Sequence, residues 1–185
     1  VILVAILKPH ARTDNLVDPT RTELFFGRYL LFFIMSQLQA LIIIAGDLYI
    51  LKIQCLHPGL LYLTGFFPSL TFSLLIYALT YSFGDVGKAV VVIVMVLQIA
   101  GSSGTFPVEL LPEFNRRIYI LFPFPYAIDM MRECICGLYG MQYLQKLGLL
   151  MIFAVIGLVI GLLVSKPFSG LNHFMEEKLE ETELF

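Results

Sequence analysis

The chain has 185 residues, a formal net charge of -2, 58% hydrophobic residues and only 14% charged residues. Its mean hydropathy of +0.86 and its apolar content exceed the usage of soluble domains, so the composition is that of a membrane protein. The charge balance gives no basic surface for nucleic acid, and three cysteines without a CxxC pair favour neither a disulfide framework nor a zinc site. We therefore expect no nucleic-acid partner, no metal and no cofactor.

The first 28 residues divide into two parts. Residues 1–7, VILVAIL, are apolar but lack the basic stretch that precedes such a run in a signal peptide, so we interpret them as the end of a truncated transmembrane helix in a longer protein. Residues 8–28 are polar and turn-rich, and we expect a cytoplasmic loop that ends in the start of a helix, with Thr20 and Glu23 at capping-box spacing. This segment is either a solvated linker or a contact surface for a partner subunit. Its candidate coupling residues are Thr20, Arg21, Glu23 and Arg28.

The first complete span is predicted from Tyr29 to about Leu51, long enough to cross a hydrocarbon core of about 30 Å. Its polar residues gather on one helical face, which we expect to contact protein rather than lipid: Ser36, Gln39, Gly46 and Asp47. Gln39 and Asp47 are the intramembrane polar candidates. Asp47 is either functional or simply hydrated near the interface.

Two further spans follow as antiparallel neighbours. Residues 60–81 form the second span, with Pro68 inside it, and residues 82–88 form a very short turn. Residues 89–100 begin the third span, which needs residues 101–107 to reach full depth.

The fourth complete span covers residues 147–165 without a charge, and residues 166–185 form an acidic cytoplasmic tail. Gly157 and Gly161 make a GxxxG motif, for which we favour packing within the chain over a dimer seam. The predicted fold is thus an all-α integral membrane bundle of four complete transmembrane helices plus a truncated one.

Four complete spans place residues 8–28, the 82–88 turn and the C-terminus on one side of the membrane. That side carries seven basic residues: Lys8, Arg12, Arg21, Arg28, Lys88, Lys166 and Lys178. The other side carries five: Lys52, Arg116, Arg117, Arg132 and Lys146. The positive-inside rule then predicts a cytoplasmic C-terminus.

Residues 101–140 are too apolar for an open loop, yet their prolines and charges make them a poor span. We predict two short re-entrant or interfacial helices on the outer side, at about 108–119 and 125–140. Gly101 to Gly104 spell GxSG, a serine-protease form, but no span offers a histidine base for it. Since the chain also lacks a Walker motif, we expect no enzymatic activity.

Several motifs occur in a recognisable order: FFGRYLLFF, the HPG turn, FGDVGKA, LQIAGSSGTFP and the proline-rich segment that follows. From about residue 18 to 165 the chain resembles the C-terminal membrane domain of the phage infection protein (YhgE/Pip) family, which is related to type-2 ABC exporter permeases. The resemblance implies an N-terminal span, a large extracellular insert and five spans, with re-entrant or interfacial helices before the last. Residues 29–165 would then form a permease-like domain.

The function that this resemblance implies is that of a permease-like subunit in transport across the bacterial cytoplasmic membrane. Its partners would be the lipid bilayer, a separate ATP-binding subunit and, as an open question, a second copy of the chain. The alternative is a membrane anchor for a large extracellular receptor or envelope module. The matched positions imply an architectural outer gate formed by Gly101, Gly104, Pro107, Glu109, Pro112, Pro123, Pro125, Tyr126 and Arg132.

Overall fold

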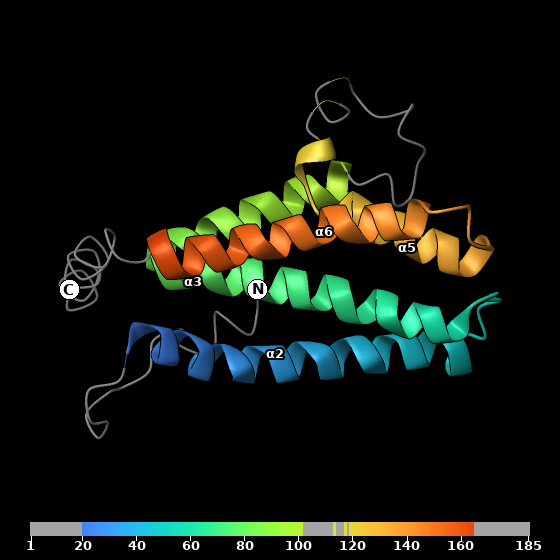
Figure 1. Ribbon diagram of the computed structural model, residues 1–185, viewed down its shortest axis with the longest axis horizontal. Helices are drawn as coiled ribbons and strands as arrows, with labels where there is room; N and C mark the ends of the chain where they lie inside the picture. The colour runs from blue at the N-terminus through green and yellow to red at the C-terminus, as the bar shows by residue number, and fades with distance from the viewer. Residues whose placement is uncertain (1–19, 102–112, 114–116, 118, 165–185) are drawn as a thin grey trace, which may run out of the picture.

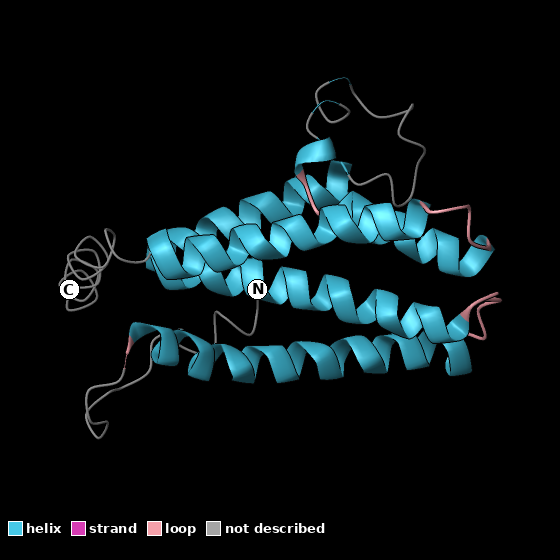
Figure 2. Ribbon diagram, viewed as in Figure 1, coloured by secondary structure: helices cyan, strands magenta, loops and turns pink. Residues whose placement is uncertain are grey.

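The computed structural model describes residues 20–101, 113, 117 and 119–164, and helices dominate these residues (Figures 1 and 2). The long elements are α2 (Arg21–Ala45), which continues as the π-helix η1 (Gly46–Ile50), α3 (Pro58–Gly101) and α6 (Gln142–Val159), which continues as the π-helix η4 (Ile160–Val164). The short elements are the 3₁₀ helix η3 (Tyr119–Leu121) and α5 (Phe124–Cys136).

The start of α2 confirms the predicted capping box. The backbone N–H of Thr20 donates to Oε2 of Glu23 at 2.8 Å, which satisfies one of the donors left free at a helix start. The helix therefore begins eight residues before the predicted span at Tyr29 and runs without a break to Ile50.

The predicted turn over residues 82–88 is confined to one residue. Helical geometry persists to Ser82 and Phe83 and fails at Gly84, whose φ of 58° and ψ of -130° suit only glycine. Beyond this break the chain folds back on itself. The two arms come so close that a Cβ added to Gly87 would collide with the carbonyl oxygen of Leu79. The two arms of α3 are thus antiparallel neighbours, as predicted.

The second short helix of the outer segment is α5, which begins at Phe124 and ends at Cys136 rather than at residue 140. It ends early because Gly137 has a φ of 115°, a backbone conformation that a helix does not continue. The first short helix, predicted at 108–119, lies mostly outside the described residues. Glu113 and Arg117 within it are helical.

Among the described residues, three helices are long and apolar enough to cross a membrane: Thr22–Ile50, Pro58–Gly84 and Gln142–Leu163. The second arm of α3 gives a shorter apolar helix, Val86–Ile99, with a length of about 21 Å at 1.5 Å per residue. This is less than the hydrocarbon core of about 30 Å, and the residues that would extend it, 102–107, lie outside the described residues. The truncated span predicted at 1–7 also lies outside them. The count of four complete spans plus one truncated span therefore stays a prediction.

The α3 helix is the centre of the bundle, with α2 along one side and α6 along another (Figure 1). The glycines of the GxxxG motif allow a close approach to both neighbours. An added Cβ on Gly157 would lie 3.3 Å from Leu75 of α3, and one on Gly161 would lie 2.5 Å from Phe25 of α2 and 3.2 Å from Ala78 of α3. The expected packing within the chain is confirmed.

The ends of the helices gather at two opposite ends of the bundle (Figure 1). At one end, Ser82 Oγ donates to the carbonyl oxygen of Ile160 at 3.1 Å, and Phe25 in the first turns of α2 packs against Gly161. At the other end, the backbone N–H of His57 donates to the carbonyl oxygen of Cys134 at 3.2 Å. The start of α2, the Gly84 break and the end of α6 therefore share one end, as the predicted topology requires.

Candidate functional site

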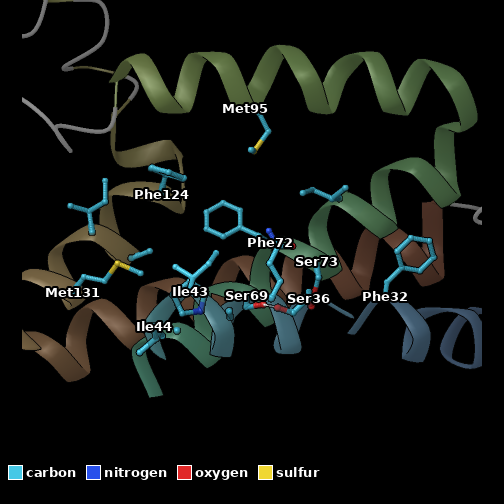
Figure 3. Close-up of a pocket in the computed structure, with 17 residues that line it drawn as sticks. Phe32, Ser36, Ile43, Ile44, Ser69, Phe72, Ser73, Met95, Phe124 and Met131 are labelled. Atoms are coloured by element: carbon cyan, nitrogen blue, oxygen red, sulfur yellow. Dashed lines mark hydrogen bonds between the residues drawn. The ribbon is translucent and has the colours of Figure 1, made fainter. Parts of the chain in front are cut away.

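A cavity of about 460 Å³ lies among α2, both arms of α3 and α5 (Figure 3). We call it the membrane cavity. Its volume lies within the range of about 300–1,000 Å³ that is usual for ligand pockets. Phe72 projects between the helices, and Met95 points toward it from the second arm of α3.

Each wall of the membrane cavity is one face of a helix, because its residues recur at three- and four-residue intervals. The walls are Phe32, Ser36, Gln39, Ala40, Ile43 and Ile44 of α2; Gly65, Pro68, Ser69, Phe72, Ser73, Ile76 and Met95 of α3; and Phe124, Ala127, Ile128 and Met131 of α5. Among these lining residues none is charged. The site is therefore suited to apolar molecules.

Four of the lining residues are polar, and three of them already have partners. Ser69 Oγ donates to the carbonyl oxygen of Ser36 at 2.9 Å and so joins α3 to α2, while Ser36 and Ser73 donate to carbonyl oxygens one turn back in their own helices. Gln39 differs, since its exposed amide makes no hydrogen bond within the described part of the chain. Among the polar side chains of the described lining residues, it is the one left free to bind something else.

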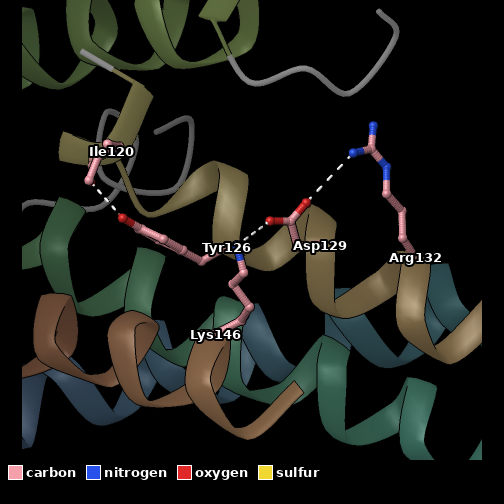
Figure 4. A network of polar contacts seen from close by, with 5 residues as sticks. All are labelled: Ile120, Tyr126, Asp129, Arg132 and Lys146. Atoms are coloured by element: carbon pink, nitrogen blue, oxygen red, sulfur yellow. Dashed lines mark hydrogen bonds and ion pairs between the residues drawn. The ribbon is translucent and has the colours of Figure 1, made fainter. Parts of the chain in front are cut away.

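Outside the cavity, α5 is joined to α6 by charged contacts that we call the α5 polar network: Tyr126, Asp129, Arg132 and Lys146 (Figure 4). Lys146 Nζ lies 2.7 Å from Asp129 Oδ2 and 5.6 Å from the centre of the Tyr126 ring. Arg132 Nη1 lies 3.6 Å from Asp129 Oδ1, and the Tyr126 hydroxyl donates to the carbonyl oxygen of Ile120 at 2.8 Å. The network holds the helix that forms one wall of the cavity.

A second, buried set of contacts fixes the other end of α5. The Thr64 hydroxyl lies 3.1 Å from Cys134 Sγ and 3.0 Å from the Tyr143 hydroxyl, which joins α3, α5 and α6. Cys55 Sγ donates to the carbonyl oxygen of Cys134 at 3.2 Å. All three cysteines are free, and the sequence did not favour a disulfide framework.

The predicted outer-gate residues fall into three groups. Pro123, Pro125 and Tyr126 are buried around the first turn of α5, and Arg132 is exposed on its outer face. Gly101 is the last residue of α3. The remaining four lie outside the described residues: Gly104, Pro107, Glu109 and Pro112. Tyr126 and Arg132 are brought together in the α5 polar network, and a role for any of these residues as a gate stays a prediction.

The predicted coupling residues lie at the start of α2. Thr20 and Glu23 are exposed and form the capping box, Arg21 is the first helical residue, and Arg28 is half-buried two turns further on. Of the four residues predicted for the protein-facing side of the first span, Ser36 and Gln39 line the membrane cavity, whereas Gly46 and Asp47 belong to η1 and do not.

Several residues of the site were not singled out from the sequence. The wall of α5 has spacing typical of an amphipathic helix, at Phe124, Ala127, Ile128 and Met131, and this signal would have identified it. Lys146 was assigned only to a side of the membrane, because its partner Asp129 lies 17 residues away across a turn that local patterns do not describe.

Comparison with known proteins places this helical, cavity-containing bundle in a family. The family model described as "ABC-2 family transporter protein" matches residues 18–163, which is most of the chain. The chain therefore belongs to the ABC-2 transporter membrane family and is a permease-like, multi-pass membrane protein.

The chain is also similar to a protein of Bacillus subtilis (strain 168) described as "Uncharacterized protein YhgE". The two are 29% identical over 157 residues, which is 84% of this chain and 20% of the relative. The chain thus spans about a fifth of the length of that protein. Together with the family match, this similarity confirms the predicted relationship to the membrane domain of the YhgE/Pip family. No solved structure matches the chain.

Proposed function

We propose that this chain is the membrane subunit of a transporter that moves a substrate across the cytoplasmic membrane of a bacterium, driven by a separate ATP-binding subunit. The observation that carries the proposal is the family match over residues 18–163, which covers α2, α3, α5 and α6 together. The membrane cavity supports it, because a site between helices at membrane depth is where a transported molecule would be held.

In this proposal the start of α2 faces the cytoplasm and contacts the ATP-binding subunit. Glu23 and Thr20 are exposed there, and Arg28 lies two turns into the helix. Because α2 continues unbroken to Gln39 and Ile43, a displacement at its start would be transmitted along the helix to the membrane cavity. The end of α6 lies at the same end of the bundle, so the proposal includes a cytoplasmic C-terminus.

The test is purification of the full-length protein from native membranes in mild detergent, with identification of the proteins that accompany it. We expect an ATP-binding subunit, and we expect that charge reversal at Glu23 and Arg28 together releases it while the membrane protein stays folded. The matched control reverses the charges of Arg132 and Glu133, which lie on α5 at the opposite end. Recovery without any ATPase, and export unchanged by the α2 variant, would contradict the proposal.

A second possible function, that of a membrane anchor, is favoured by the much greater length of the Bacillus subtilis protein. Since the chain spans only about a fifth of that protein, the remainder is large enough to form an extracellular module, for which these helices would be a membrane anchor serving as a receptor or envelope scaffold. Replacing the helices by an unrelated membrane anchor separates the two functions. An anchor function survives this exchange, whereas transport does not.

A further inference from the structure

Gln39 lies near the middle of the first candidate membrane span. About 16 Å of helix separates it from Ile50 and about 25 Å separates it from Thr22, the two ends of the first candidate span. A hydrocarbon core of about 30 Å centred on this helix therefore includes Gln39. An amide at that depth has no water to bind, so leaving it without a partner is unfavourable.

The neighbouring glutamine Gln37 has the kind of partner that Gln39 lacks. Gln37 lies two residues away on the same helix, and its Nε2 donates to the carbonyl oxygen of Phe66 at 3.4 Å. Gln39 lines the membrane cavity, and its amide has no such partner within the described part of the chain. A molecule in the cavity would supply the missing hydrogen bonds.

The other lining residues define the chemistry of that molecule. Phe32, Phe72, Ile76 and Met95 offer apolar surface on three sides, which suits a hydrocarbon chain. Since none of the described residues of the lining is charged, a charged headgroup would be buried there without a counter-ion, which is strongly unfavourable. The side chain of Gln39 is exposed, so a molecule dissolved in the bilayer reaches it directly.

From these observations we propose that the membrane cavity binds a neutral single-chain amphiphile, with its chain among the aromatic and aliphatic walls and its uncharged polar group hydrogen-bonded to Gln39. The inference rests on the proposed function only in treating this amphiphile as a transported molecule. Binding itself needs no nucleotide.

The test uses the full-length protein in lipid nanodiscs without nucleotide. The probe is a long-chain monoacylglycerol with a photoreactive diazirine in its chain, and an alkyl phosphate with the same chain and diazirine is the charged comparison. After illumination, mass spectrometry locates the labelled residues. We expect the monoacylglycerol to label the cavity walls of α2, α3 and α5, and the alkyl phosphate to label them several-fold less.

Two pairs of variants test the geometry. Gln39→Leu removes the polar partner and lowers cavity labelling by the monoacylglycerol by roughly threefold to tenfold, the range of one hydrogen bond in a membrane, whereas Gln37→Leu does not lower it. Ala40→Phe fills the cavity and abolishes labelling there. Ile42→Phe adds the same ring on an exposed, lipid-facing position and leaves the labelling unchanged.

Labelling spread evenly over the lipid-facing side of α2, or unchanged in Gln39→Leu, would overturn the inference. A disulfide between two copies of Gln39→Cys, with no cavity labelling, would also overturn it and assign Gln39 to a dimer contact. The experiments distinguish failure of the proposed ligand binding from failure of the proposed transport function. If the protein exports with its ATPase but shows no cavity labelling, only the proposed binding of the amphiphile is contradicted. If the cavity is labelled but no ATPase accompanies the protein, only the proposed transport function is contradicted.

Discussion

The Asp129–Lys146 ion pair is the closest charged contact in the described part of the chain, and both side chains are largely shielded, at 23% and 30% exposure. Lys146→Met removes the closer cation and leaves the Asp129 carboxylate with the longer contact to Arg132. We expect a loss of about 1–3 kcal/mol in unfolding free energy, less than for a fully buried pair because water still reaches both groups. Thermal unfolding in detergent measures the change.

Arg132→Gln is the matched control for that variant. Arg132 lies farther from Asp129, at 3.6 Å, and is 48% exposed, so its removal should cost less than about 1 kcal/mol. Equal losses for the two variants would mean that Lys146 does not hold α5 to α6.

The buried amide of Gln98 is a second single-residue feature. Gln98 is 5% exposed, and its Oε1 has no hydrogen-bond partner among the described residues. Because an unsatisfied buried polar group costs about 1–3 kcal/mol, Gln98→Met should raise the unfolding free energy by about 1 kcal/mol. Gln37→Met, which removes a hydrogen bond to Phe66, should lower it. Chemical unfolding of both variants in detergent checks the signs, and a loss in Gln98→Met contradicts the assignment of an unpaired acceptor.

At the scale of elements, the contact of η4, which continues α6, with α2 and α3 depends on glycine. A Cβ at Gly161 would lie 2.5 Å from Phe25 and 3.2 Å from Ala78, so Gly161→Ala must displace the Phe25 ring from a packed aromatic cluster. We expect a loss of about 1–3 kcal/mol in unfolding free energy, since overpacking forces side chains from their preferred positions.

Gly148→Ala lies on the same helix with nothing within 4 Å of the added Cβ. It should be neutral or stabilise by up to about 1 kcal/mol, the difference in helix propensity. Both variants can be followed by thermal unfolding. A loss in Gly148→Ala as large as that in Gly161→Ala would indicate that helix flexibility, rather than close packing, is what α6 needs.

The short helices show what local patterns can predict. The capping box at Thr20 and Glu23 places the start of α2 because all of its atoms lie within one turn. The end of α5 is displaced from the prediction, since Gly137 stops it after Cys136 while Leu138 and Tyr139 still look helical by composition. Glycine conformations of this kind depend on how the chain is packed.

For the whole molecule, the orientation in the membrane is the testable consequence. The exposed Cys136 lies at the end of α5, at the opposite end of the bundle from Thr22, which is exposed at the start of α2. In a protein whose only cysteine is Cys136, a membrane-impermeant maleimide should label intact cells. With Thr22→Cys as the only cysteine, labelling should require permeabilised cells. The reverse pattern would place the C-terminus outside and contradict the positive-inside prediction.

Composition and hydropathy by themselves determined that this is a helical membrane protein, where its long apolar helices lie and that two arms of α3 are antiparallel. These properties follow from the lengths of the apolar segments and of the polar turns between them, which can be read directly from the sequence.

Only the tertiary structure decided which helix faces meet. The walls of the membrane cavity come from four segments, and the choice of Gln39 over Asp47 as a lining residue depends on how α2 packs against α3 and α5. The physical reason is that a membrane helix is apolar toward lipid and toward protein alike, so hydrophobic periodicity does not tell the two faces apart. Small residues such as Gly157 and Gly161, and hydrogen bonds such as that from Ser69 to Ser36, make that distinction, and their partners lie 33 or more residues away.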